Sequence, residues 1–140
     1  MSKQICIIDG QGGGIGATVI KYIRDAIGEA VTLIALGTND TASAAMLKAG
    51  ADLAAAGENS ICRAVNDADI IIGPVGITWS NAMMGEVTPD IAEAVMSSFA
   101  YKILLPFTQE SAEIIGVVKE PLPHMVEKAV NLTKEVLKNV

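Results

Sequence analysis

The chain has 140 residues, of which 51% are hydrophobic, 19% charged and 4% aromatic, and its formal net charge is −6. This length suffices for one sizeable core, so we expect a single domain over residues 1–140. The acidic balance and the scattered Lys and Arg residues disfavour nucleic acid as a partner. No apolar run reaches the ~18–20 residues of a membrane span. Since the chain also opens without a signal-peptide pattern, we expect a cytoplasmic protein.

The cysteines and the histidine predict no metal centre. Cys6 and Cys62 form no CxxC pair, and the one histidine, His124, is distant from both in sequence. Neither a disulfide framework nor a zinc site is indicated, so we expect two buried, reduced thiols and no metal site.

Strand and helix patterns alternate through the first half of the chain. Residues 3–9 (KQICIID) form an apolar run of strand length, and a glycine cluster separates them from helical spacing at residues 15–27. Residues 31–36 predict a second strand, and the turn at 37–40 supplies cap chemistry for a helix to about residue 49.

The same alternation continues toward the C-terminus. The predicted elements are a weak strand at 51–55, a short helix at 58–66, a buried strand at 69–73 (DIIIG), one or two helical turns at 78–84, a helix from the Thr88-Pro89-Asp90 cap to about 96, a strand at 103–106, a strand at 113–118 (EIIGVV) and a helix from about 123. The turn predicted before EIIGVV has only four residues, 108–111, which is too short for a crossover helix and favours an antiparallel edge strand there. The fold class is therefore α/β, with a doubly wound, mostly parallel, Rossmann-like sheet.

The glycine-rich segment after the first strand predicts an anion site. A helix that begins behind a strand offers unpaired N–H groups and a partial positive charge, and glycines keep the approach open. The spacing fits two dinucleotide-binding patterns, G-x-x-x-G-I/L-G from Gly10 and G-x-G-x-x-A from Gly12. A tight turn without a ligand is the alternative. The residues expected to contact the ligand here are Gly10, Gly12, Gly13, Gly14, Ile15 and Gly16.

Three absences restrict the chemistry. Ala17 stands where a P-loop carries its lysine, which disfavours a P-loop NTPase. Neither Tyr22 nor Tyr101 is followed by the lysine of a Tyr-x-x-x-Lys pair, so short-chain dehydrogenase catalysis is missing. No acid ends the second strand, where it would receive the adenosine ribose hydroxyls; Thr38 and Asn39 lie there instead, and Asn39 either reaches the ribose or caps the next helix.

A second loop should face the first one across the carboxyl ends of the strands. It consists of Gly73, Pro74, Val75 and Gly76, and its glycines allow the backbone to approach a ligand. Asp9, which ends the first strand, is expected either to hold a ligand hydroxyl or magnesium ion or to serve the turn. Glu58 and Glu86 each lie beside a glycine in loops that border the crevice, but two carboxylates of unknown separation support no acid–base mechanism.

Six segments together resemble a family of small bacterial proteins that is defined only as a domain of unknown function. They are residues 12–16 (GGGIG), 36–39 (LGTN), 46–51 (MLKAGA), 57–59 (GEN), 73–77 (GPVGI) and 85–89 (GEVTP). The resemblance covers nearly the whole chain. It implies a Rossmann-like fold and brings no activity, substrate or catalytic residue.

Three hypotheses follow. The first is a module that binds a nucleotide or dinucleotide, with NAD or another adenine nucleotide as the suspected cofactor. The second is a small enzyme that uses this cofactor, with Asp9, Thr78 or Glu86 as polar candidates. The third is an oligomeric structural subunit, whose glycine loop would be occluded by packing. We expect a homodimer, because so small a domain gains from completing its cleft with a second copy.

Overall fold

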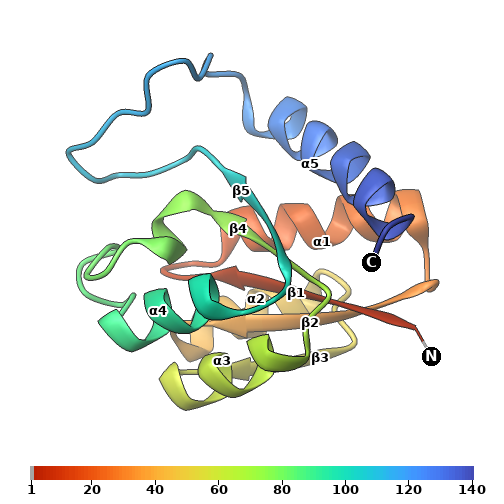
Figure 1. The fold of residues 1–140 in the computed structure, drawn as a ribbon, viewed down its shortest axis with the longest axis horizontal. Coiled ribbons are helices and arrows are strands. Elements are labelled where there is room, and N and C mark those ends of the chain that lie inside the picture. Colours follow the sequence, from red (N-terminus) through yellow and green to blue (C-terminus); the bar gives the residue numbers. More distant parts are fainter. Residues whose placement is uncertain (1) are drawn as a thin grey trace.

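The computed structural model describes residues 2–140 and contains a five-stranded, all-parallel sheet (Figure 1). Its strands are β1 (Lys3–Asp9), β2 (Val31–Gly37), β3 (Leu53–Ala56), β4 (Ile70–Pro74) and β5 (Tyr101–Leu105). Their order is β3-β2-β1-β4-β5. The chain moves outward from β1 to β3 and then crosses back to β4, so the topological switch point lies between β1 and β4. The α/β, Rossmann-like fold expected from the sequence is confirmed.

Helices cover both faces of this sheet. One face carries α1 (Gly14–Ile27), α2 (Asp40–Lys48) and α5 (Leu122–Leu137), and the other carries α3 (Glu58–Ala64) and α4 (Pro89–Ser97). Two 3-10 turns, η1 (Val65–Asp67) and η2 (Val75–Thr78), flank β4. None of the helices among the described residues has the length and apolar character needed to cross a bilayer.

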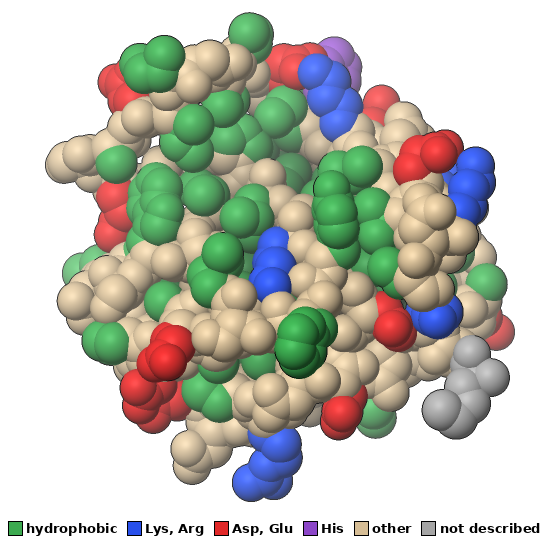
Figure 2. All heavy atoms as spheres, in the orientation of Figure 1, with side chains coloured by type: hydrophobic (Ala, Val, Ile, Leu, Met, Phe, Trp, Pro, Cys, Tyr) green, Lys and Arg blue, Asp and Glu red, His purple; other side chains and the backbone are tan. Residues whose placement is uncertain are grey.

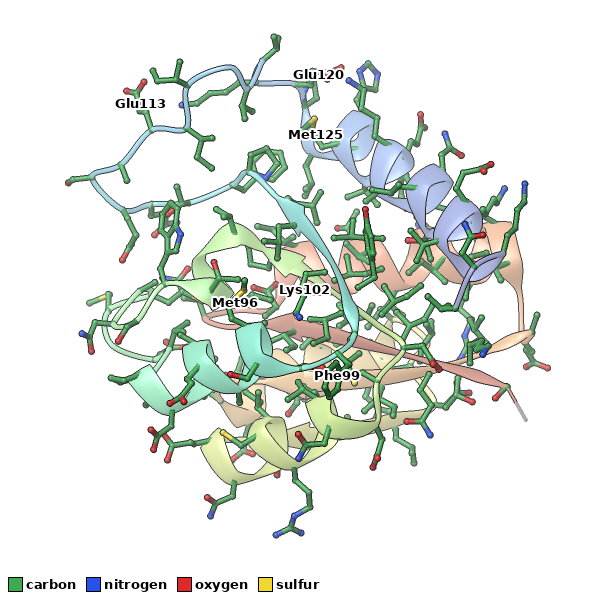
Figure 3. The ribbon with its side chains drawn as sticks, in the orientation of Figure 1. Met96, Phe99, Lys102, Glu113, Glu120 and Met125 are labelled. Atoms are coloured by element: carbon green, nitrogen blue, oxygen red, sulfur yellow. The ribbon has the colours of Figure 1, made fainter. Side chains whose placement is uncertain are left out.

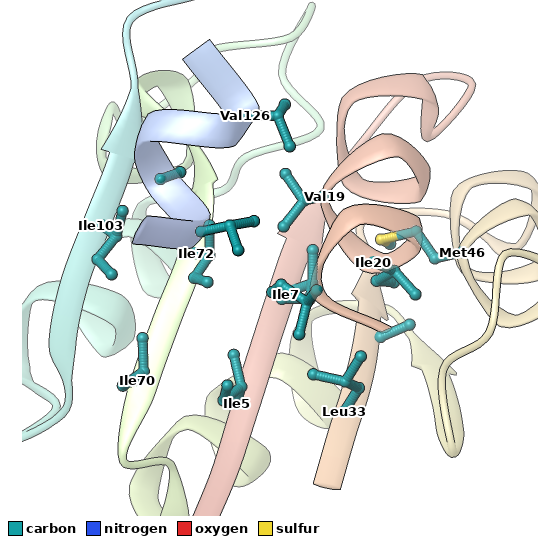
Figure 4. Packing of buried hydrophobic residues seen from close by; sticks show 14 of the residues in the cluster. Ile5, Ile7, Val19, Ile20, Leu33, Met46, Ile70, Ile72, Ile103 and Val126 are labelled. Carbon is teal, nitrogen blue, oxygen red and sulfur yellow. The ribbon is translucent and has the colours of Figure 1, made fainter. Parts of the chain in front are cut away.

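The central strands are buried on both faces because alternate residues of a strand point in opposite directions. In β1, Ile5 and Ile7 pack toward α1 and α5, as Figure 4 shows, whereas Cys6 and Ile8 pack toward α3 and α4. All four are fully buried. Since burying one such side chain contributes about 1.5–3 kcal/mol, these two layers hold β1 and its carboxyl end in place.

The predicted helix caps are confirmed where a polar side chain carries them. The Asn39 side chain accepts a hydrogen bond of 2.8 Å from the Ala42 amide at the start of α2. Thr88 accepts one of 3.3 Å from the Ile91 amide, and Pro89 takes the first position of α4.

The predicted strand at residues 113–118 is wrong. Residues 106–121, which we call the arm, are irregular and connect β5 to α5, and no antiparallel strand occurs in the sheet between residues 2 and 140. Gly116, at φ +92°, breaks the extended backbone in the middle of EIIGVV. The side chains of Ile115 and Val118 are consequently 93% and 75% exposed.

The arm projects from the molecule. Figure 3 shows Glu113 on its outer part and Glu120 and Met125 where the chain returns to α5. In the space-filling view of Figure 2, hydrophobic side chains are visible along this projection and over the adjacent edge of the sheet.

The expectation of two buried thiols is correct for one cysteine only. Cys6 is buried in β1, and burial, with a smaller contribution from Asp67, raises the pKa of its thiol to about 12. Cys62 lies on α3 and is only partly buried. Both cysteines are free.

Candidate functional site

A cavity of about 270 Å³ lies at the carboxyl ends of β1 and β4, the switch point of the sheet. Asp9 and Ile15 line it from the β1 side, and Pro74 and Gly76 from the β4 side. Met83 belongs to the connection between η2 and α4 and lines a third side. The root of the arm completes the wall through Phe107, Thr108, Gln109 and Glu110.

Three glycines of the first loop are buried and serve packing. A β-carbon on Gly10 would lie 2.6 Å from the sulfur of Met83, and one on Gly16 would meet the side chain of Met46. Gly13 has φ +76°, and a β-carbon there would lie 2.8 Å from the carbonyl oxygen of Ala42. Gly13 therefore requires glycine whether or not a ligand binds, and a β-carbon at Gly10 or Gly16 would force a methionine side chain to move.

Two other glycines of the same loop face open space. Gly12 and Gly14 are exposed, and no heavy atom lies within 4 Å of the position that a β-carbon would occupy on either. Their amides make no hydrogen bond to another residue between 2 and 140. Gly14 is the first residue of α1, so its amide is one of the unpaired donors at the positive end of the helix.

Asp9 accepts hydrogen bonds from two backbone amides at the start of α1 and in the glycine loop before it. Its side chain is buried, and its two oxygens accept hydrogen bonds of 2.8 Å from the Gly10 amide and 2.7 Å from the Gly16 amide. Burial raises the pKa of Asp9, the amides of Gly16, Gly10 and Ile15 act in the opposite direction, and the nearby charge of Glu86 raises it further. Asp9 therefore positions the loop, and a bound anion would have to use the donors that it leaves open.

Glu86 binds at the end of β2, although it comes from a distant part of the chain. Its Oε1 accepts hydrogen bonds from the Thr38 hydroxyl at 2.6 Å, the Gln11 amide at 2.9 Å and the Asn39 side-chain amide at 2.9 Å. Partial burial raises the pKa of Glu86, but these three donors together outweigh it and leave the pKa below its ordinary value.

This contact was not predicted. In the sequence no acid ends β2, whereas the structure supplies one from a residue 48 positions after Thr38. The only sequence signal was the turn-forming Gly85 beside Glu86, and a turn residue does not reveal where its loop will dock.

Residues 79–88, which we call the crossing loop, carry Glu86 to this position. Within the loop the Asn81 amide donates to the Val87 carbonyl at 2.7 Å, and at its end Thr88 donates to Glu58. Asn81, Met83 and Met84 have positive φ values of 72°, 57° and 57°. Among residues 2–140 the only other non-glycine residue with positive φ is Gln11, in the glycine loop. Unfavourable backbone conformations thus concentrate in the two loops of the site.

The remaining predicted residues divide between the cavity and the core. Pro74 and Gly76 line the cavity, whereas Gly73 and Val75 are buried, and Gly73 packs against the backbone of Ile8. The hydroxyl of Thr78 donates to the Val75 carbonyl at 2.7 Å, inside η2. His124 is exposed at the start of α5 and does not line the cavity.

The chemistry of the site is that of backbone donors and two carboxylates. Neither Asp9 nor Glu86 forms an ion pair with a Lys or Arg in the part of the chain that the structure describes. No three His, Cys, Asp or Glu side chains in that part gather in a way that could hold a metal ion.

A parallel sheet with a glycine loop after its first strand and a cavity at its switch point defines a Rossmann-like α/β protein. Residues 4–138 match the family described as "Domain of unknown function (DUF3842)", and the chain belongs to that family. The curated proteins include no significant match to this chain. The family relationship confirms the resemblance seen in the sequence and assigns no activity.

Proposed function

We propose that this protein binds a nucleotide at the carboxyl end of β1, with a phosphate on the exposed amides of Gly12 and Gly14. The observation that carries the proposal is that the glycine loop contains two kinds of glycine, packed and exposed. Three glycines are explained by packing, but packing leaves Gly12 and Gly14 unexplained, and both lie at the positive end of a 14-residue helix.

The cavity provides room beside this phosphate position. Gln11 and Ile15, which flank the open glycines, both line it. Its volume of about 270 Å³ is close to the lower end of ligand pockets, which run from ~300 to ~1,000 Å³. A mononucleotide, or one half of a dinucleotide, suits this size better than a whole dinucleotide.

A binding module is favoured over an enzyme by the hydrogen bonds of the polar candidates. The two oxygens of Asp9 accept from backbone amides, and the hydroxyl of Thr78 donates to a neighbouring carbonyl. Asp9 and Thr78 are thus engaged within the protein itself and do not pair as a nucleophile and a base. The structural-subunit alternative predicts an occluded loop, and within one copy of the chain no described residue occludes Gly12 or Gly14.

A thermal-shift screen tests the proposal. The purified protein is heated with AMP, ATP, NAD, NADP, FAD, S-adenosylmethionine and sugar phosphates, and the screen is repeated with Gly14→Asp. A ligand that binds only the folded state at 100 times its Kd stabilises it by about 2.7 kcal/mol. Gly14→Asp adds a negative charge in the first turn of α1, which favours the helix but repels phosphate, so we expect the variant to fold and to lose the shift.

His124→Asp is the matched control, because it places the same new charge in the exposed first turn of α5. It should retain the shift. No shift of the parent protein by any nucleotide at several millimolar, or an equal shift in Gly14→Asp, would contradict the proposed site.

A further inference from the structure

We propose that Glu86 selects a nucleotide whose ribose carries a free 2′,3′-diol, and that it does so as an acid supplied to the end of β2 by the crossing loop. The inference rests on the nucleotide site proposed above and adds the ligand class: an unphosphorylated ribose is accepted, and a 2′-phosphate is refused.

The position of Glu86 is the first step. In Rossmann-type sheets the adenosine ribose lies against the end of the second strand, where an acidic residue receives its hydroxyls. β2 ends at Gly37, and the next two residues, Thr38 and Asn39, both donate to Glu86. The third donor is the amide of Gln11, inside the glycine loop. Glu86 therefore contacts both the glycine loop and the strand end, outside the lining of the cavity. A ribose that it received would lie against the end of β2, beside the cavity.

The use of its two oxygens is the second step. All three hydrogen bonds converge on Oε1, and Oε2 accepts none from residues 2–140. The donors fix the direction of the carboxylate, and the second oxygen keeps its accepting capacity. A carboxylate held in this way is preorganised to receive one or both hydroxyls of a diol.

The charge of Glu86 is the third step. Holding the crossing loop against Gln11 and Thr38 needs an accepting oxygen, and a neutral glutamine would supply one. Glu86 is instead an unpaired carboxylate in a chain of net charge −6, and its donors keep it ionised near neutral pH. A negative charge strengthens hydrogen bonds from hydroxyls and repels a phosphate. None of its three hydrogen-bond partners is basic.

Isothermal titration with three probes tests the inference: AMP, 2′-deoxy-AMP and adenosine 2′,5′-bisphosphate. A hydrogen bond to a charged group contributes ~1.5–3 kcal/mol, so the parent protein should bind AMP at least about tenfold more tightly than 2′-deoxy-AMP. It should bind the bisphosphate more weakly still. In Glu86→Gln we expect the affinity for AMP to fall to within about threefold of the affinity for 2′-deoxy-AMP, because the amide keeps the shape of the side chain and loses its charge.

Glu113→Gln is the matched control, since it removes the same charge from an exposed position on the arm. It should keep the preference of the parent for AMP. Circular dichroism and thermal unfolding establish that each variant is folded. The preference of the parent protein for AMP over 2′-deoxy-AMP is measured without any variant, so that part of the test does not depend on folding of a mutant.

The outcomes separate the two proposals. If the parent binds AMP and 2′-deoxy-AMP equally, or if folded Glu86→Gln keeps the full preference, the role of Glu86 is overturned and the phosphate site stands. If the parent binds AMP but the binding survives Gly14→Asp, the phosphate position is wrong. If the parent binds a nucleotide of the thermal-shift screen but none of the three probes, the role of Glu86 is overturned. If it binds no nucleotide at all, both proposals fail.

Discussion

The two ends of the parallel sheet use acidic side chains in different ways. At the amino end, Asp52 accepts a hydrogen bond of 2.8 Å from the Leu33 amide and pairs with Arg24 at 2.5 Å. Arg24 also donates to the carbonyls of Gly50, Gly28 and Val31. At the carboxyl end, Asp9 and Glu86 likewise accept from backbone amides, but neither has a cationic partner among residues 2–140.

This difference is what we expect if the proposed ligand binds at the carboxyl end. At the amino end the Arg24–Asp52 pair holds together the start of β2, the start of β3 and the end of α1, whereas Asp69 accepts from the Gln4 amide at 2.8 Å without a cationic partner among the described residues. The carboxyl end has two carboxylates without a cationic partner among residues 2–140, four non-glycine residues with positive φ, two exposed glycines and a cavity. Natural proteins depart from local rules of stability chiefly at functional sites, so this concentration at one end supports placing the ligand there.

The largest expected effects come from glycines that pack at the carboxyl end. Gly13→Ala should destabilise the protein by about 3 kcal/mol, because it combines overpacking against the backbone of α2 with a left-handed backbone that alanine disfavours. Gly73→Ala should cost a similar amount through its contact with the backbone of Ile8. Urea unfolding measures both.

The open glycines provide the contrast for this prediction. Gly12→Ala and Gly14→Ala meet no heavy atom within 4 Å, and each should change the stability by no more than about 0.5 kcal/mol. Equal losses at all four positions would mean that Gly12 and Gly14 are packing residues too, and the argument for a ligand would lose its basis.

The next largest effect concerns the Arg24–Asp52 pair at the amino end. Asp52→Asn should lower the stability at pH 7 by about 1 kcal/mol, a value reduced for the exposure of this carboxylate. The amide of Leu33, followed by Arg24, lowers the pKa of Asp52 in the folded state. The stabilisation is therefore present above the unfolded pKa of about 3.9 and is lost as the pH falls through the folded value. Urea unfolding from pH 7 to pH 3 should show the parent and variant converging in acid.

Asp9 should show the opposite sign. Its pKa is raised in the folded state, mainly by burial. Its contribution is thus largest below the unfolded pKa of about 3.9 and is lost as the pH rises through the folded value. The stability of the parent minus that of Asp9→Asn should therefore fall as the pH rises above about 4. The loss of one accepting oxygen adds a cost that does not change with pH. Parallel slopes for Asp9→Asn and Asp52→Asn would remove the electrostatic distinction between the two ends.

Sequence reasoning succeeded where the determinants are local. The apolar run of β1, the glycine cluster and the helical spacing of α1 are contiguous, and the Thr88-Pro89-Asp90 cap needs only its own helix. It failed for EIIGVV because a strand requires an edge to pair with, and no local pattern shows whether one is within reach. It treated the glycines of the loop as one group, since only the positions of Met83 and Ala42 in space reveal which of them are packed.

The candidate site was predictable as a place and not as a set of contacts. The rule that ligands bind at the carboxyl ends of strands located it between the Gly10–Gly16 loop and the Gly73–Gly76 loop. The structure does bring these loops together around one cavity. The positioning of Glu86 at the end of β2 depends on how the crossing loop folds over β1, which no spacing in the sequence encodes.

The smallest effect belongs to the arm, the least buried part of the carboxyl end. Ile115→Asp should change the stability by no more than about 0.5 kcal/mol, because its side chain already contacts solvent. The same change at Ile103, which is buried in β5, should prevent folding, since a charge would be buried without a partner.

Limited proteolysis should cut the parent first between residues 111 and 118 of the arm, where the backbone makes few hydrogen bonds. Because Phe107 and Glu110 line the cavity from the root of this arm, a nucleotide that binds there should slow the cut at the arm while leaving the rate at other sites unchanged. Cleavage at an equal rate with and without AMP, under conditions where AMP is shown to bind, would place the ligand on the glycine loop alone and exclude the arm from the site.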